Sequence, residues 1–219
     1  MTRAAVARPL AAALAALALA GCASGPPYRL DLRYDPRDPG TQVPGAGAVV
    51  VGLAPARDAR GLSDSAAIGR RITMQNEVEP IMPAGPRAEA VVTEALRLRL
   101  SASGFPVRPV PAWDLRPETL DPAWGNAVIG TEVLEFWTEA RSEALRPTRI
   151  ASRARIRLVI GDPQGKRIVW TNTVESASEQ EVARFTPRAA EGNANEALGG
   201  AIRSLVESAD LRDRLTALR

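Results

Sequence analysis

The side chains that could carry out chemistry in this chain form a short inventory. The 219 residues include no histidine, a single cysteine at Cys22 and a single lysine at Lys166. Histidine-based catalytic triads, metal sites built from cysteine and histidine, and disulfides within the chain are therefore excluded. An enzyme built on this sequence would depend on carboxylates, on a serine–lysine pair or on tyrosine. We therefore expect a protein that is not an enzyme and that binds no metal and no cofactor.

Three glutamates lie close together in a segment that is predicted to form a long strand, residues 128–139. Because side chains alternate between the two faces of a strand, Glu135 and Glu139 would share one face and Glu132 would point to the other. They would not form the compact carboxylate pair that a glycoside hydrolase needs. This placement disfavours a hydrolase acting on peptidoglycan, and we interpret the glutamates as solvated or paired across strands.

Cys22 follows a segment with the organisation of a secretory signal peptide. Arg3 and Arg8 precede an apolar run at residues 9–20 that consists almost entirely of alanine and leucine. The run is shorter than the roughly 20 residues that cross a bilayer, and it ends in small residues. We expect residues 1–21 to be a signal peptide. Its removal takes away two arginines and lowers the formal net charge from +3 to +1, a balance that argues against nucleic acid as a partner.

The sequence Leu19-Ala20-Gly21-Cys22 resembles the lipobox of bacterial lipoproteins. The resemblance implies cleavage before Cys22 and attachment of fatty acyl groups, such as palmitate, to its thiol and its new N-terminus. In enteric bacteria an aspartate after the lipidated cysteine retains the protein at the inner membrane, and Ala23 stands there in this chain. The resemblance therefore implies a lipid anchor in the outer membrane, on its periplasmic face. An ordinary signal peptide followed by a chance cysteine is the alternative.

The mature chain is expected to contain an extended tether and one domain. Residues 22–46 would comprise the lipidated cysteine and a poorly packed tether, because proline and glycine are dense from residue 23 to residue 46. Within it, Leu30, Leu32 and Tyr34 alternate with charged residues and could form a short edge strand. Residues 47–219 would then form a single α+β domain.

The first half of that domain predicts a strand, a small hairpin, a helix and a second strand. Residues 48–53 are apolar on both faces, which is typical of a buried central strand. Residues 68–82 could form the hairpin. Residues 86–102 carry an apolar helical stripe that ends before Gly104, a suitable left-handed cap, and residues 106–110 follow as a short strand.

Two polar or aromatic sets in this half have both a functional and a structural interpretation. Asp58 and Arg60 could be a binding pair, but we favour a local ion pair that closes a loop. Residues 111–126 contain Trp113, Trp124 and several prolines, which predicts a loop with at most one helical turn. We favour buried tryptophans that hold this loop in place over an aromatic platform for a ligand.

The most regular feature is a hairpin whose first strand alternates apolar residues with arginines. Its outer face would carry the candidate partner-binding residues, which are Arg149, Arg153, Arg155 and Arg157. Residues 162–165 suit a three-residue loop ending in a left-handed glycine, which places Arg153 opposite Glu175 and Arg149 opposite Glu179. Arg155 and Arg157 would then face threonines and leave a local positive surplus. This face is either a solvated sheet surface or a docking site for an acidic partner.

A final helix is predicted to begin near Pro187, after Thr186 as its N-cap. Its apolar stripe is interrupted by Gly192, Gly199 and Gly200, which could permit close packing on the sheet. Leucines near the C-terminus could continue this helix or form a second, short one.

The order of these features is similar to that of the YajG family of bacterial lipoproteins. The resemblance rests on the lipobox, on Leu30-Asp31-Leu32-Arg33-Tyr34, on Asp58-Ala59-Arg60, on Ile68-Gly69 and on Ser103-Gly104-Phe105. It implies an α+β fold related to the N-terminal domain of TolB and to the curli-secretion lipoprotein. We expect a mixed sheet with a C-terminal antiparallel meander, packed by two main helices on one face. The family implies no catalytic residues.

The sequence therefore predicts a lipoprotein anchored in the outer membrane that acts in the periplasm as a non-catalytic assembly or scaffold component of the envelope. It would contact the membrane through its N-terminal lipid and bind an envelope protein whose identity the sequence does not give. The alternative is an auxiliary lipoprotein of an ABC-type lipid transporter, which would need an apolar groove beside the first helix.

Overall fold

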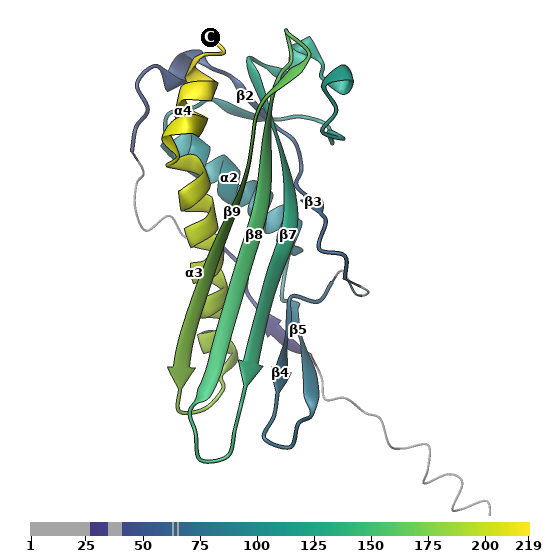
Figure 1. Cartoon of the computed structure of the whole chain (residues 1–219), viewed down its shortest axis with the longest axis vertical. Helices are drawn as coiled ribbons and strands as arrows, with labels where there is room; N and C mark the ends of the chain where they lie inside the picture. Colours follow the sequence, from purple (N-terminus) through teal and green to yellow (C-terminus); the bar gives the residue numbers. More distant parts are fainter. Residues whose placement is uncertain (1–26, 35–40, 63, 65) are drawn as a thin grey trace, which may run out of the picture.

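The computed structural model describes residues 27–34, 41–62, 64 and 66–219. These residues form a nine-stranded mixed sheet with helices on one face, so the predicted α+β fold is confirmed (Figure 1). The described helices are α2 (Ala88–Ala102), α3 (Pro187–Val206) and α4 (Ala209–Thr216), with 3-10 turns η1 (Ala46–Ala48), η2 (Pro117–Thr119) and η3 (Pro122–Trp124). The predicted signal peptide, the lipobox and Cys22 lie outside the described residues.

The sheet is organised around its longest strands. Six described strands are short: β1 (Tyr28–Leu30), β2 (Val51–Leu53), β3 (Arg57–Asp58), β4 (Gly69–Ile72), β5 (Val78–Pro83) and β6 (Val107–Pro109). The C-terminal meander consists of β7 (Ala127–Arg141), β8 (Thr148–Asp162) and β9 (Arg167–Val182). β7 pairs antiparallel with β8 along one edge, and along its other edge it pairs in parallel with β2, β3 and β4 in turn.

Helices α2 and α3 cover the inner face of the long strands (Figure 1). Alternate residues of β8, among them Ile156 and Leu158, are fully buried there because the apolar stripe of α3 packs on them. At Gly200 a Cβ atom would lie 2.2 Å from Ser176 Oγ, so the predicted close packing through glycine is confirmed at this position. Gly192 has no such neighbour.

The predicted helix boundaries are largely confirmed. α3 begins at Pro187, and the Thr186 side chain accepts a hydrogen bond from the Ala189 backbone N–H at 3.2 Å. The C-terminal leucines form a separate helix, α4. α2 ends before Gly104, whose φ of +96° is the left-handed conformation that favours glycine. It begins at Ala88, two residues later than predicted, because Arg87 has an extended backbone.

The predicted central strand and the small hairpin are confirmed, whereas part of the predicted tether belongs to the domain. β2 lies between β6 and β7, although it begins at Val51 and not at the predicted residue 48, which belongs to η1, and β4 pairs antiparallel with β5. β1 pairs in parallel with β5, and both Leu30 and Leu32 are buried. The packed domain therefore includes residues 28–34, before the predicted boundary at residue 47.

Three local irregularities change the predicted pairing of the long strands. The β8–β9 turn has four residues, with Lys166 in the left-handed position instead of Gly165, which shifts the register by one residue. A bulge at Val169, between the Ile160–Trp170 and Gly161–Ile168 pairs, shifts it by one more, so Arg155 lies opposite Glu175. Beyond that bulge the total shift is two residues, which keeps each side chain on its predicted face. In β7 a bulge at Leu134 inserts one extra residue, so Glu132 lies on the same face as Glu135, contrary to the prediction.

Candidate functional site

The four arginines of the predicted partner-binding set all lie on the outer face of β8, but their environments differ. Arg149 forms an ion pair with Glu179, with its Nη2 2.7 Å from Glu179 Oε2. Arg157 forms an ion pair with Glu132 of β7. The side chains of Arg153 and Arg155 are exposed and form no ion pair or hydrogen bond within the part of the chain that the structure describes. These two are the cations that remain open to a partner.

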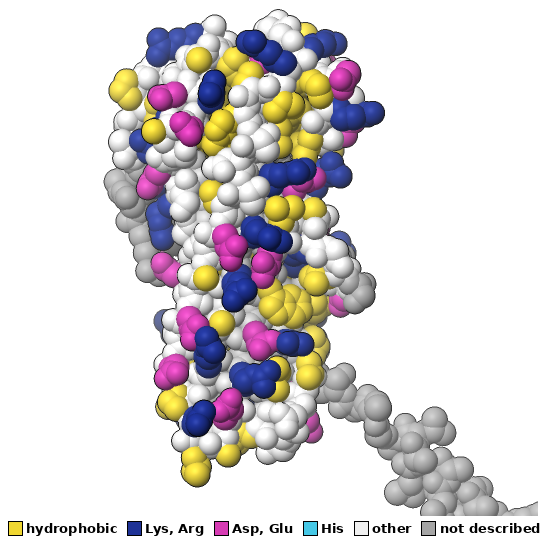
Figure 2. Space-filling view, viewed as in Figure 1, with side chains coloured by type: hydrophobic (Ala, Val, Ile, Leu, Met, Phe, Trp, Pro, Cys, Tyr) yellow, Lys and Arg dark blue, Asp and Glu magenta, His cyan; other side chains and the backbone are white. Residues whose placement is uncertain are grey.

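The predicted positive surplus at Arg157 is therefore wrong, and the bulge explains why. It turns Glu132 to the outer face, where the carboxylate is 10% exposed and lies between Arg157 and Arg57, the latter at 3.9 Å. Farther along β7, Glu139 pairs with Arg70 at 2.6 Å. Charges of both signs consequently alternate over the lower part of this face (Figure 2).

Sequence reasoning missed the aromatic residue at the centre of this surface, Trp137. It lies on β7 directly opposite Arg153 and is half-buried. A shallow depression of about 310 Å³ surrounds it, lined by Glu135, Trp137, Glu139, Arg141, Arg149, Ala151 and Arg153. The signal was present in the sequence, because period-two alternation places Trp137 on the same face as Glu135 and Glu139.

An apolar recess of about 150 Å³ borders Trp137 on its other side. Its lining includes Leu62, Leu134 and Phe136. Arg60, in the loop after β3, also lines the recess and donates a hydrogen bond to the Phe136 carbonyl oxygen of β7. We call the surface formed by Leu62, Leu134, Trp137, Arg153 and Arg155 the open patch.

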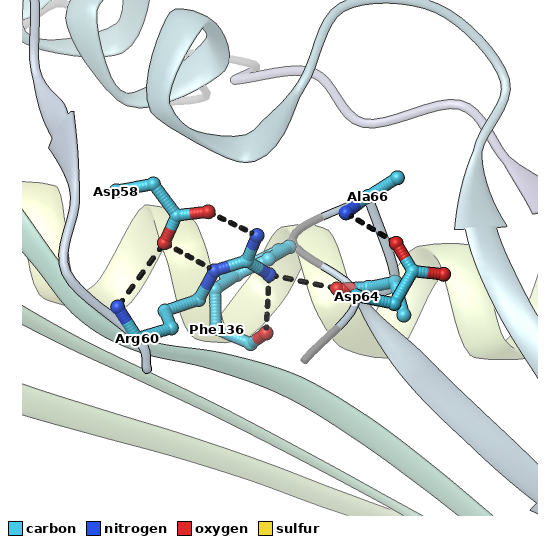
Figure 3. A network of polar contacts seen from close by, with 6 residues as sticks. Asp58, Arg60, Asp64, Ala66 and Phe136 are labelled. Atoms are coloured by element: carbon cyan, nitrogen blue, oxygen red, sulfur yellow. Dashed lines mark hydrogen bonds and ion pairs between the residues drawn. The ribbon is translucent and has the colours of Figure 1, made fainter. Parts of the chain in front are cut away.

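Asp58 and Arg60 form the local ion pair that we favoured, and they fix that loop (Figure 3). The guanidinium donates to both Asp58 oxygens, at 2.8 and 2.7 Å, and to the backbone carbonyl oxygens of Ala67 and Phe136, at 2.9 and 3.4 Å. These hydrogen bonds hold the pKa of the Asp58 carboxyl below its usual value. The Arg60 side chain is 2% exposed, so this pair serves the loop and is not presented to a ligand.

The upper end of the same outer face is covered by residues 111–126. The buried Trp113 and Leu120 form a second hydrophobic cluster there with Val128 and Val159 of the strands. We call this region the covered end. The prediction that a buried tryptophan holds the loop is confirmed for Trp113, whereas the loop contains two 3-10 turns instead of at most one.

The described residues show neither a metal-binding cluster nor a membrane-spanning helix. They contain no group of three or more histidine, cysteine, aspartate or glutamate residues placed to hold a metal ion. No helix in the described part of the chain is long and apolar enough to cross a membrane.

Comparison with known proteins gives a fold and no family. No protein-family model and no curated protein matches the chain. Among solved structures it is similar to protein XCC0632 from Xanthomonas campestris, of the family DUF330, with 16% identity over 89% of this chain and 100% of that chain and a TM-score of 0.54. At this identity the likeness shows a shared fold alone.

Two further solved structures have lower TM-scores. A protein assigned as a neuraminyllactose-binding hemagglutinin homologue from Helicobacter pylori has 10% identity over 87% of this chain and 100% of that chain, with a TM-score of 0.47. Lipoprotein GNA1162 from Neisseria meningitidis has 15% identity over 73% of this chain and 99% of that chain, with a TM-score of 0.36. Likenesses below 0.5 support no argument about function.

Proposed function

We propose that this chain is a lipid-anchored protein of the bacterial envelope that acts through protein contacts and not through catalysis. The lipobox at Leu19-Ala20-Gly21-Cys22 supports the anchor, and Ala23 supports the outer membrane and its periplasmic face as the location. The resemblance to the YajG family supports a role as an assembly or scaffold component. In this proposal the protein contacts the membrane through the lipid on Cys22, and it binds its protein partner at the open patch.

The single observation that carries the protein contact is the composition of the open patch. Trp137 lies between the unpaired Arg153 and an apolar recess, and tryptophan and arginine are the residues most enriched at the energetic centres of protein interfaces. The arginine fork can bind a carboxylate with two hydrogen bonds. A partner segment that combines an apolar side chain with a nearby carboxylate fits this arrangement.

The charges around the patch support binding over catalysis. A carboxylic acid that donates a proton near neutral pH needs a raised pKa. Arg149 instead holds the pKa of Glu179 below its usual value through their hydrogen bonds. Glu132 and Glu139 are engaged in ion pairs with Arg157 and Arg70.

The test is co-purification from envelopes with the full-length, lipidated chain. Changing Arg153→Glu together with Arg155→Glu should leave the thermal midpoint nearly unchanged and abolish recovery of an acidic envelope partner. The control is Lys166→Glu with Arg214→Glu, two exposed cations elsewhere, which makes the same change in net charge. Arg157 is unsuitable for this test because its removal would leave Glu132 short of a partner. Equal recovery of every partner by both double variants would reject the open patch as the docking site.

The alternative, an auxiliary lipoprotein of an ABC-type lipid transporter, keeps the same anchor and differs in its ligand. It needs an apolar groove beside α2, but the apolar stripe of that helix, including Val92 and Leu96, is packed against the domain core. Lipid extracted from the purified protein, or transporter subunits recovered with it, would favour this alternative.

A further inference from the structure

The loops at the lower end of the molecule expose apolar side chains that the fold does not use. Met74 and Val78, at the β4–β5 turn, are 60% and 56% exposed, and Leu145, in the β7–β8 turn, is fully exposed. Single exposed apolar residues are common on protein surfaces. Three of them on the turns of two hairpins at one end of a domain form a more specific arrangement.

Leu145 is the least expected of the three. Its φ of +61° is in the left-handed region, which favours glycine, asparagine or aspartate. Its side chain makes no contact that would offset this backbone strain, because it is fully exposed. A strained and solvent-exposed leucine contributes nothing to folding, which points to a role outside the fold.

The sheet topology brings the two turns together. β4 runs parallel to β7, with Ile72 opposite Arg141, and the Ser142 backbone N–H donates to the Ile72 carbonyl oxygen at 2.9 Å. Both hairpins therefore turn at the same level, beyond the ends of these two strands. Figure 1 shows the two loops side by side at the lower end, opposite the C-terminus, and Figure 2 shows hydrophobic side chains at that end.

The N-terminal strand enters the fold from this same end. β1 is parallel to β5, with Tyr28 opposite Ile81, so the N-terminal end of β1 faces the same way as the N-terminal end of β5 at Val78. Arg71 of β4 holds this entry in place. Its guanidinium carbon lies 5.4 Å from the centre of the Tyr28 ring and 4.8 Å from that of Phe185, and its Nη1 lies 3.0 Å from Glu79 Oε2.

The chain length limits how far the lipid can be from these turns. Five peptide units join Pro27 to Cys22, and a fully extended chain spans at most about 3.6 Å per residue, so the two Cα atoms are within about 18 Å. Val78 precedes Ile81 by three residues, which places it about 10 Å beyond the level of Tyr28. Cys22 is therefore joined by a short segment to a point about 10 Å from the level of Val78, so its lipid can reach the same membrane surface as the hairpin turns.

We infer that the β4–β5 and β7–β8 turns insert Met74, Val78 and Leu145 into the surface of the membrane that holds the lipid on Cys22. The inference rests on the proposed lipidation of Cys22. Charges in the loops of this end are balanced, with Glu77 and Glu143 offset by Arg146 and Arg184. The contact is therefore apolar and does not depend on anionic lipid. This contact would orient the domain with its lower end on the membrane and the open patch farther from the membrane surface.

The test uses the full-length, lipidated protein reconstituted into phosphatidylcholine vesicles. Because lipidation consumes the Cys22 thiol, Leu145→Cys supplies the only free thiol, which can carry an environment-sensitive fluorophore. Gln164→Cys, in the exposed β8–β9 turn at the opposite end, is the matched control, and Met74→Cys is an independent second reporter. The emission of the probe at 145 and at 74 should shift to shorter wavelength and be quenched by spin-labelled lipid. The probe at 164 should show neither effect, and added phosphatidylglycerol or salt should change nothing.

The outcomes separate this inference from the proposal beneath it. If the protein floats with the vesicles while the probes at 145 and 74 behave as they do in solution, the inference is overturned and the anchor stands. If the probe at 164 responds as strongly as the probe at 145, the end-on contact is also overturned. If the lipid-processed protein cannot be obtained, or does not float, the proposed anchor fails and the inference fails with it.

Discussion

The covered end and the open patch lie on the outer face of the same strands, and they differ in what the strands present there. At the covered end β7 and β8 present Gly130 and Gly161, and a Cβ atom on Gly130 would lie 2.6 Å from the Trp113 ring. At the open patch the same two strands present Trp137 and Arg153. The glycines leave space that a loop of the same chain fills. The large side chains are not covered by such a loop, so their surface is accessible to another molecule.

The difference in side-chain size along β7 and β8 gives one face of the sheet both a structural region and a binding region. Trp113 is 2% exposed, and its indole N–H donates to the Arg116 carbonyl oxygen at 2.9 Å, so its polar atom is satisfied within the chain. Trp137 is half-buried and has a mixed polar and apolar surround. If the comparison holds, removal of Trp113 must destabilise the fold much more than removal of Trp137.

The largest effect should come from truncating the tryptophan of the covered end. Trp113→Ala should lower the free energy of unfolding by about 3–5 kcal/mol, because it removes a buried aromatic side chain and leaves a cavity over the strands. Trp137→Ala should lower it by about 1 kcal/mol or less, as for residues near the surface. Urea unfolding of the two variants measures both values. Similar losses would abolish the distinction between the two regions.

A smaller effect should separate two neighbouring arginines of β8. Arg157→Met removes the closer ionic partner of Glu132, which is only 10% exposed, and should lower the free energy of unfolding by about 1 kcal/mol. Arg157 is itself 42% exposed, so solvent screening keeps the loss well below that of a fully buried pair. Arg155→Met, with no ion pair to lose, should stay within about 0.5 kcal/mol of the wild type. Chemical denaturation at low salt measures both losses. A larger loss for Arg155→Met than for Arg157→Met would show that the assigned pairing is incorrect.

The smallest effect should appear in acid, at the covered end. The Thr119 hydroxyl, followed by the backbone and side chain of Arg116, lowers the pKa of Asp114 to about 2 from an ordinary 3.8. Because the folded pKa is the lower one, this contribution to stability is present above the ordinary pKa and is lost as the pH falls through about 2. The thermal midpoint of Asp114→Asn should therefore fall less steeply between about pH 4 and pH 2. Glu118→Gln, in the same loop, controls for the change in charge and should keep the steeper fall.

The faces of β8 could be predicted because alternation is a property of neighbouring residues. Its pairing could not, because it depends on three irregularities that alternation does not reveal: the left-handed Lys166 and the bulges at Leu134 and Val169. None of these residues is a glycine, the usual sequence mark of a left-handed turn position. Beyond the Val169 bulge the predicted faces are still correct, because a register shift of two keeps side chains on the same face.

The candidate site was predictable in part for the same reason. The spacing of the four arginines shows that they share one face. It does not show that Arg157 pairs with Glu132, because that ion pair depends on the bulge in β7. The folding of residues 111–126 over the upper end depends on space above Gly130 and Gly161, which arises only when β7 and β8 pair. Trp137 could have been found from its position between two outward-facing glutamates.

The most direct test of the central claim is photo-crosslinking in intact cells from the two regions of the outer face. A photoreactive amino acid at position 153, in the open patch, should yield a discrete product with one envelope protein. The same amino acid at position 118, exposed on the loop of the covered end, should yield none. Products of equal intensity from both positions, or no product from position 153 in a correctly lipidated protein, would contradict the claim that this protein acts through a partner bound at the open patch.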